Sequence, residues 1–149
     1  MSDPSISGYQ ESYRGQVLAR ECDGMGHMNI QFYIARLNGA MHNTFPRTGV
    51  DLADYLDRRV GFAAVQQDNR FISELYAGDL IHMESAILGA SNKAVHFSHR
   101  LYNSTDGRLC FTSRMTSVYL DLVSRKAIPL TEAMRRQIEA IRVDEEEAV

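Results

Sequence analysis

The spacing of apolar residues predicts a single long helix in the first third of the chain. From residue 28 to about residue 47 apolar side chains recur every three to four positions, which is the period of a helix with one buried face. Pro46 and Gly49 mark its expected end. Ahead of it, residues 13–20 contain the apolar run Val17-Leu18-Ala19 and are typical of a strand. The expected buried face consists of Tyr33, Leu37, Ala40, Met41, Thr44 and Phe45.

After a polar connection over residues 50–59, which has room for a short helical turn, the pattern becomes strand-like for about sixty residues. We expect strands over residues 60–76, 80–88, 94–102 and 109–120. Turn-forming residues separate them at positions 77–79, 89–93 and 103–107. Strands joined by such short turns pair in antiparallel fashion, because parallel pairing requires a crossover.

A short helix is expected beyond Pro129, with Thr131 as its N-cap and an apolar stripe formed by Met134, Ile138 and Ile141. The order of elements predicts an α+β fold in one domain over residues 13–142. Residues 1–12 are expected to be loose, and residues 143–149 form an acidic tail to which we assign no function.

Composition excludes several classes of protein. The net charge of −3 argues against a nucleic-acid-binding protein, and no apolar run approaches the length of a membrane span. The N-terminus lacks the features of a signal peptide, and two cysteines are too few for a disulfide scaffold. We therefore expect a cytoplasmic protein. The chain has no His, Cys, Asp and Glu spacing typical of a metal site, and we expect neither metal nor cofactor.

The candidate chemistry lies where the first strand gives way to the long helix. Asp23 stands in a glycine-rich turn, and His27 and Asn29 follow it immediately before the helix. A helix start offers unpaired N–H groups that stabilise an oxygen which becomes anionic during a reaction. A carboxylate beside that oxygen supplies a nucleophile or a general base. The stretch therefore contains the two parts that acyl transfer requires.

The same residues resemble a known family. Asp23, Gly26, His27, Asn29 and Tyr33 match the signature of hotdog-fold acyl-CoA thioesterases of the 4-hydroxybenzoyl-CoA thioesterase type. The resemblance extends over roughly residues 13–130, including an Ala-Gly-Asp turn at 77–79, an Asp-Gly hairpin at 106–107 and a final strand that ends in Tyr-Leu-Asp.

This resemblance implies an antiparallel sheet wrapped around one long central helix, and a homodimer or homotetramer with active sites between subunits. It implies hydrolysis of an acyl-CoA thioester, with Asp23 as nucleophile or general base and no choice between the two routes. Helix N-terminal amides around Met28 to Ile30 would form the oxyanion hole, with Gly26, His27 and Asn29 positioning the substrate.

Two departures limit what can be transferred from relatives. One branch of the family uses a Glu on the central helix, and residues 28–47 contain none. Another branch has an aromatic residue or His seven positions after the catalytic Asp, where this chain has Ile30. The acyl preference of that branch therefore cannot be transferred.

Each residue also has a purely structural interpretation. Asp23-Gly24 is a common turn pair, His27 and Asn29 are suitable helix caps, and Tyr33 is more typical of a core than of a ligand site. His96 and His99 lie on opposite faces of one expected strand, so they cannot jointly bind one metal ion. We favour the catalytic interpretation for Asp23 because the whole hotdog pattern follows it.

Coenzyme A carries several phosphate charges, so a net acidic protein needs a local basic feature to bind it. In related enzymes a basic position at the start of a central strand has this role, and the resemblance assigns it here to Ser91, Asn92 and Lys93. Arg70 and Arg100 are weaker candidates. Two other functions stay open from the sequence: a hotdog dehydratase or hydratase, and a non-catalytic acyl-CoA-binding module.

Overall fold

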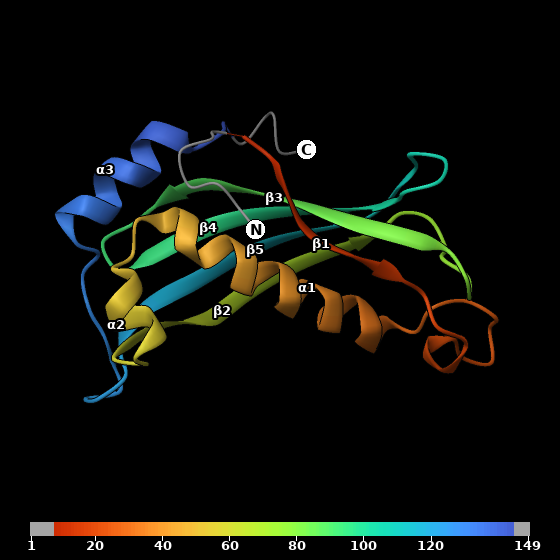
Figure 1. Ribbon diagram of the computed structural model, residues 1–149, viewed down its shortest axis with the longest axis horizontal. Coiled ribbons are helices and arrows are strands. Elements are labelled where there is room, and N and C mark those ends of the chain that lie inside the picture. Colours follow the sequence, from red (N-terminus) through yellow and green to blue (C-terminus); the bar gives the residue numbers. More distant parts are fainter. Residues whose placement is uncertain (1–7, 145–149) are drawn as a thin grey trace.

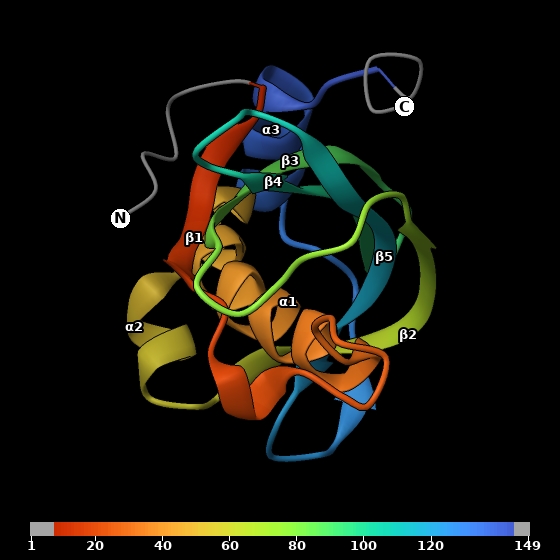
Figure 2. The same cartoon turned by 90° about the vertical axis from the view of Figure 1, so that its right-hand side faces the viewer.

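The computed structural model describes residues 8–144, in which a curved sheet encloses a central helix (Figure 1). The elements in chain order are β1 Gln10–Gln16, η1 Ala19–Glu21, α1 Ile30–Thr44, η2 Phe45–Thr48, α2 Leu52–Leu56, β2 Val60–Phe71, β3 Leu80–Ala90, β4 Ala94–Asn103, β5 Leu109–Asp121, β6 Lys126–Ala127 and α3 Glu132–Ile141. Figure 2 shows the sheet curling around α1 when the molecule is viewed along the helix. The expected α+β architecture, including the short C-terminal helix, is confirmed.

The sheet has the strand order β1-β3-β4-β5-β2, every pair is antiparallel, and the two-residue β6 pairs with β5. Strands β3, β4 and β5 are neighbours joined by short turns, as the sequence indicates. Strand β2, in contrast, pairs with β5 and not with β3, the next strand in sequence. This crossover makes the long strand β2 an edge of the sheet, and β1 forms the opposite edge.

Helix α1 begins two residues later than the periodicity predicts. Met28 is still extended, forming an isolated bridge with Cys22, and its N–H donates to the carbonyl of Leu75 at 2.8 Å. The helix starts after Asn29, whose side chain caps it by accepting from the N–H of Gln31. It ends at Thr44, where a 3-10 turn with Pro46 takes over.

The inner face of α1 is buried as predicted, with Tyr33, Leu37, Ala40, Met41 and Thr44 each less than 5% exposed. These side chains pack against residues of one face of the sheet, including Phe97 and Phe111, both fully buried. Fifteen residues give a helix of about 22 Å, so α1 crosses most of the sheet and presents its two ends at opposite ends of the domain (Figure 1).

Strand β2 ends at Phe71 rather than at residue 76, and three further boundaries differ from expectation for identifiable reasons. Strand β1 begins at Gln10, so residues 10–12 are paired with β3 rather than loose, and residues 1–7 lie outside the described part. The chain leaves the strand after Gln16, because a 3-10 turn forms over Ala19–Glu21 in place of the expected strand end. At the other terminus Val143 is 8% exposed and donates its N–H to Ile87, so it belongs to the packed domain. The acidic residues 145–147 lie outside the described residues.

Candidate active site

Asp23 is held in a compact loop between η1 and α1. Its backbone N–H donates to the carbonyl of His27 at 3.1 Å, and its carbonyl accepts from the N–H of Gly26 at 2.9 Å. Its carboxylate oxygen Oδ1 accepts from the N–H of Met25 at 2.9 Å. Gly26 has φ of 91°, a left-handed conformation that favours glycine. The glycine-rich sequence therefore closes a tight loop that fixes the Asp23 backbone.

Asn29 connects the Asp23 carboxylate to the start of the central helix. Its side-chain Nδ2 donates to Asp23 Oδ2 at 3.0 Å, while its Oδ1 accepts from the N–H of Gln31 at 3.2 Å. One amide group thus orients the carboxylate and caps the helix. The hydrogen bond from Asn29, with a second from the Met25 N–H, holds the pKa of Asp23 below its usual value, so the residue is ionised at neutral pH.

The helix start leaves one backbone donor without a partner. The N–H of Met28 donates to Leu75 and that of Asn29 donates to Glu21, each at 2.8 Å, so these two expected oxyanion donors are occupied. The amide of Gln31 is bonded to the Asn29 cap. Within residues 8–144, Ile30 is the only one of the three expected donors whose N–H meets no acceptor. Of the three expected donors, only the N–H of Ile30 is therefore available to an oxyanion.

A pocket of about 450 Å³ opens beside this N–H group. Three of the predicted substrate-positioning residues line it: His27, Met28 and Ile30. Asp23, Gly26 and Asn29 are not among its lining residues; Gly26 closes the loop, and Asn29 caps α1 and bonds the Asp23 carboxylate. Tyr33 is buried as expected, yet it also borders the pocket. The remaining walls come from the end of β2 and the segment after it, namely Phe71, Ile72, Ser73 and Glu74.

The sequence did not point to Glu21 and Arg36, which anchor the Asp23 loop. Glu21 lies two residues before Asp23, and its carboxylate accepts two hydrogen bonds from the guanidinium of Arg36 on α1. Both side chains are buried. A sequence signal was hard to find, because the two residues are fifteen positions apart and belong to different elements. Glu74 and Phe71 were missed for the same reason, since only the folded chain brings them to the pocket.

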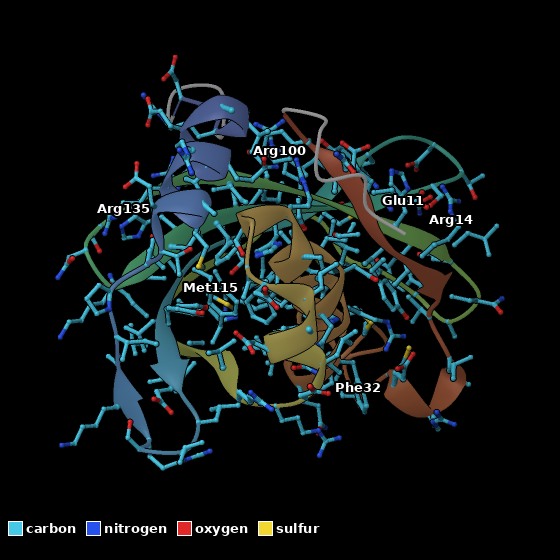
Figure 3. The ribbon with its side chains drawn as sticks, turned by 60° about the vertical axis from the view of Figure 1, so that its left-hand side comes forward. Glu11, Arg14, Phe32, Arg100, Met115 and Arg135 are labelled. Carbon is cyan, nitrogen blue, oxygen red and sulfur yellow. The ribbon has the colours of Figure 1, made fainter. Side chains whose placement is uncertain are left out.

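In a single chain, the predicted CoA-binding residues lie at the end of the sheet that is far from the Asp23 loop. Ser91, Asn92 and Lys93 form the turn between β3 and β4, next to α3 (Figure 1). Figure 3 shows Arg135 on α3 at this end, and its Nη2 donates to the carbonyl of Asn92 at 2.7 Å. Strand β3 starts near the Asp23 loop and runs eleven residues, about 36 Å, before it reaches this turn. A single chain therefore does not unite Lys93 with Asp23.

Arg70 and Arg100 lie on the face of the sheet that is turned away from α1. Arg70 lines a smaller cavity of about 230 Å³ together with Asp68 and Arg114, and no residue of the Asp23 loop borders it. The guanidinium of Arg100 lies over the ring of Tyr9 at 4.1 Å from its centroid. We take the pocket beside Ile30 as the candidate site, because it adjoins the start of α1 and a backbone N–H that meets no acceptor within residues 8–144.

The two strand histidines are engaged separately, on opposite faces of β4. His99 is fully buried, bonds Ser85 Oγ through Nδ1 at 2.6 Å, and has its pKa lowered to about 3 by burial. His96 bonds Thr116 on the other face at 2.9 Å. Among residues 8–144 no group of three or more His, Cys, Asp or Glu side chains is placed to hold a metal ion. No helix in the described part of the chain is long and apolar enough to cross a membrane.

The fold and the site define a hotdog domain with an acidic residue fixed in the loop ahead of its central helix. A family model, that of the thioesterase-like superfamily, matches residues 17–138, and the chain belongs to this superfamily. The match includes the Asp23 loop and every strand from β2 to β6.

Two curated relatives carry the name L-carnitine dehydrogenase/betainyl-CoA thioesterase. The protein from Agrobacterium fabrum is 27% identical over 126 residues, which are 83% of this chain and 25% of that protein. The protein from Rhizobium meliloti is 21% identical over 126 residues, 85% of this chain and 25% of its own length. The chain therefore spans about a quarter of the curated relatives that it matches.

Solved structures confirm the fold. The probable thioesterase YbaW from Escherichia coli superposes with a TM-score of 0.75 at 18% identity, covering 90% of this chain and all of that chain. A hypothetical protein from Staphylococcus aureus, solved in complex with CoA, has a TM-score of 0.75 at 19% identity and covers 93% and 86% of the two chains. A 1,4-dihydroxy-2-naphthoyl-CoA thioesterase from Synechocystis gives 0.71 at 18% identity, with 88% and 96% covered.

Proposed function

We propose that this protein hydrolyses an acyl-CoA thioester to a free acid and CoA, with Asp23 as the catalytic carboxylate. The observation that carries the proposal is the link through Asn29 between the Asp23 carboxylate and the first turn of α1. The proposal is supported by the lowered pKa that keeps Asp23 ionised and by the N–H of Ile30, the residue after Asn29, which meets no acceptor and borders a pocket. Membership of the thioesterase-like superfamily supports the same chemistry.

In the proposed mechanism the thioester carbonyl oxygen faces the Ile30 N–H. Attack on the carbonyl carbon moves charge onto this oxygen, and a well-placed donor typically lowers the barrier by ~3–4 kcal/mol. Asp23 either attacks the carbon, giving a mixed anhydride and CoA thiolate, or removes a proton from the attacking water. In the first route water then cleaves the anhydride and regenerates the carboxylate. Both routes need ionised Asp23, which its lowered pKa favours.

We infer that the working unit is at least a dimer formed through the edge strand β2. This strand is twelve residues long, and an unpaired edge of that length is a ready site for pairing with another strand. Val65 on it is 61% exposed, and Phe71 and Ile72 at its end are 49% and 53% exposed. Pairing with a second copy would cover Val65 and place the pocket, with Phe71 and Ile72 in its wall, between protomers. Antiparallel pairing would also bring the partner's far end toward Asp23, which the proposed role of Ser91, Asn92 and Lys93 in CoA binding requires.

The decisive experiment follows CoA release from a panel of acyl-CoA esters with a thiol reagent. Betainyl-CoA belongs in the panel because two relatives carry that name. We expect turnover by the wild type and a fall of about 10²–10⁴-fold in kcat/KM for Asp23→Asn. The matched control is Asp57→Asn, which removes an exposed carboxylate at the other end of α1 and leaves turnover unchanged.

Each competing function gives a different result in this assay. A dehydratase or hydratase would interconvert 3-hydroxyacyl-CoA and enoyl-CoA without releasing CoA. A binding module would retain the ester unchanged and would be indifferent to Asp23→Asn. Near wild-type turnover by the Asp23→Asn variant would refute the assignment of Asp23.

A further inference from the structure

The pocket beside Ile30 combines aromatic walls with a single carboxylate. Tyr33 and Phe71 supply two rings, and Glu74 supplies the negative charge. None of its eight lining residues is Lys or Arg. A pocket lined only by apolar groups would accept neutral acyl chains of many kinds. A carboxylate in the wall makes the pocket selective for charge, because it repels carboxylated acyl groups and attracts cationic ones.

Glu74 is an exposed residue in the wall of the pocket, and its carboxylate has a neighbour that holds it. The hydroxyl of Tyr76 donates a hydrogen bond to Glu74 Oε2. Burial raises the pKa of Tyr33 to about 12, with Cys110 and Glu74 adding to the increase, so the Glu74 charge acts on the ring that lines the pocket. The guanidinium at the rim, that of Arg108, is directed elsewhere: it donates to Ser73 Oγ at 2.9 Å and pairs with Asp106 at 3.6 Å. Glu74 is therefore not paired with Arg108.

The aromatic walls suit the same kind of ligand. Tyr33 and Phe71 pack edge to face with their centroids 5.1 Å apart, and Phe111 lies 5.1 Å from Tyr33 behind them. Phe71 remains 49% exposed, so part of its ring is available to a bound group. Quaternary ammonium groups bind against aromatic faces, and a nearby carboxylate adds to that attraction. Such groups keep their charge at every pH and need no hydrogen-bond acceptor.

We propose that this pocket receives the acyl group and selects acyl-CoA esters whose acyl group carries a fixed positive charge close to the thioester, with Glu74 as the specificity-determining residue. The inference rests on the proposed thioesterase function and extends it to the class of substrate. With the carbonyl oxygen at the Ile30 N–H, a short acyl group enters between Phe71 and Glu74. The pantetheine arm of CoA, which has no charge near the sulfur, leaves in the opposite direction.

The test compares two esters that have the same shape and differ only in charge. Trimethylammonioacetyl-CoA, which is the betainyl-CoA of the panel, and 3,3-dimethylbutyryl-CoA carry a quaternary nitrogen and a quaternary carbon at the same position. We expect the wild type to hydrolyse the cationic ester with a kcat/KM about tenfold higher or more. The ratio of the two constants should fall as salt is added, because part of the preference is an attraction between charges near the surface.

Variants assign the preference to Glu74. Glu74→Gln should lower kcat/KM for the cationic ester by about tenfold and leave that for the neutral ester within about twofold. Glu74→Asp, which keeps the charge, should retain most of the preference. Glu132→Gln is the matched control: it removes an exposed carboxylate from the first turn of α3, at the other end of the molecule, and therefore changes the net charge equally. Its ratio should equal that of the wild type.

The outcomes separate this inference from the function on which it rests. If the wild type hydrolyses the neutral ester as well as the cationic one, or if Glu74→Gln affects both esters equally, the enzyme is a thioesterase and the substrate assignment is wrong. An equal effect would also show that the CoA arm, rather than the acyl group, passes Glu74. If no CoA ester of the panel is hydrolysed, both the proposed function and this inference fail.

Discussion

Arg36, in the middle of the central helix, forms a bidentate ion pair with Glu21, two residues before Asp23. Its Nη1 donates to Glu21 Oε2 at 2.6 Å and its Nη2 donates to Oε1 at 2.5 Å. The two side chains are 10% and 4% exposed. Glu21 Oε1 also accepts from the N–H of Leu18, and the Glu21 carbonyl accepts from the N–H of Asn29. Glu21 thus connects the central helix, the 3-10 turn and Asn29, whose side chain bonds the Asp23 carboxylate.

This arrangement predicts that Arg36→Ala destabilises the protein strongly. The change leaves Glu21 buried without its partner, which typically costs about 3–5 kcal/mol in the free energy of unfolding. Arg14→Ala is the matched control, because Arg14 forms a pair with Glu11 whose side chains are 61% and 47% exposed. Exposed pairs contribute only about 0–1 kcal/mol. Urea unfolding of both variants checks the difference, and equal losses would contradict the anchoring role of Glu21 and Arg36.

Asn29 should set the acid limit of activity through the pKa of Asp23. The hydrogen bond from Asn29 lowers this pKa from its ordinary value of 3.8, so in the wild type the carboxylate stays ionised as the pH falls through that value. Asn29→Ser keeps a capping oxygen for α1 and removes the donor to Asp23. The pKa then rises toward its ordinary value, and the acid limb of kcat/KM moves to higher pH.

The measurement is the pH dependence of kcat/KM for the two proteins, with circular dichroism recorded at each pH to confirm folding. Asn29→Ala separates the two roles further. It loses the cap as well, and it should therefore also lose about 1 kcal/mol of stability. An acid limb at the same pH in wild type and Asn29→Ser would show that Asn29 does not tune the carboxylate.

A charge on the exposed edge of β2 should separate the proposed dimer. Val65 is 61% exposed at an irregularity in the pairing of β2 with β5, and a lysine there opposes strand pairing. We expect Val65→Lys to sediment as a monomer and to lose turnover, since the site would lack its second protomer. Val123→Lys is the control, because Val123 is 84% exposed in the turn after β5. An active Val65→Lys monomer would refute the interfacial site.

Lys93 tests where the nucleotide end of CoA binds. Its contact with phosphate would be exposed and screened, so Lys93→Ala should raise KM for a full CoA ester several-fold and leave kcat nearly unchanged. The same variant should behave like the wild type with an ester truncated at pantetheine. Arg70→Ala and Arg100→Ala serve as comparisons on the other candidate positions. If KM for the CoA ester is unaltered by Lys93→Ala at low salt, the nucleotide lies elsewhere.

Much of this fold follows from the sequence by itself, because its signals are local. A three-to-four spacing identified the face of α1 that is buried, and alternation with turn residues identified β3, β4 and β5. Thr131 was recognised as the N-cap of α3, where its Oγ1 accepts from Met134. The position of Asp23 before a capped helix was likewise visible, since a glycine turn and an Asn cap act over only a few residues.

Only the tertiary structure decided what depends on contacts between distant segments. The pairing of β2 with β5 joins residues up to about sixty positions apart, and it makes β2 one of the two edges of the sheet. Leu75 and Glu21 occupy the amides of Met28 and Asn29, which left Ile30 as the donor that remains available. Only the folded chain brings Arg36 into hydrogen-bonding contact with Glu21 and puts Glu74 in the wall of the pocket beside Ile30. The sequence specifies the Asp23 loop and the cap of α1 through local turn and capping chemistry, whereas long-range packing determines which donors, charges and side chains surround them.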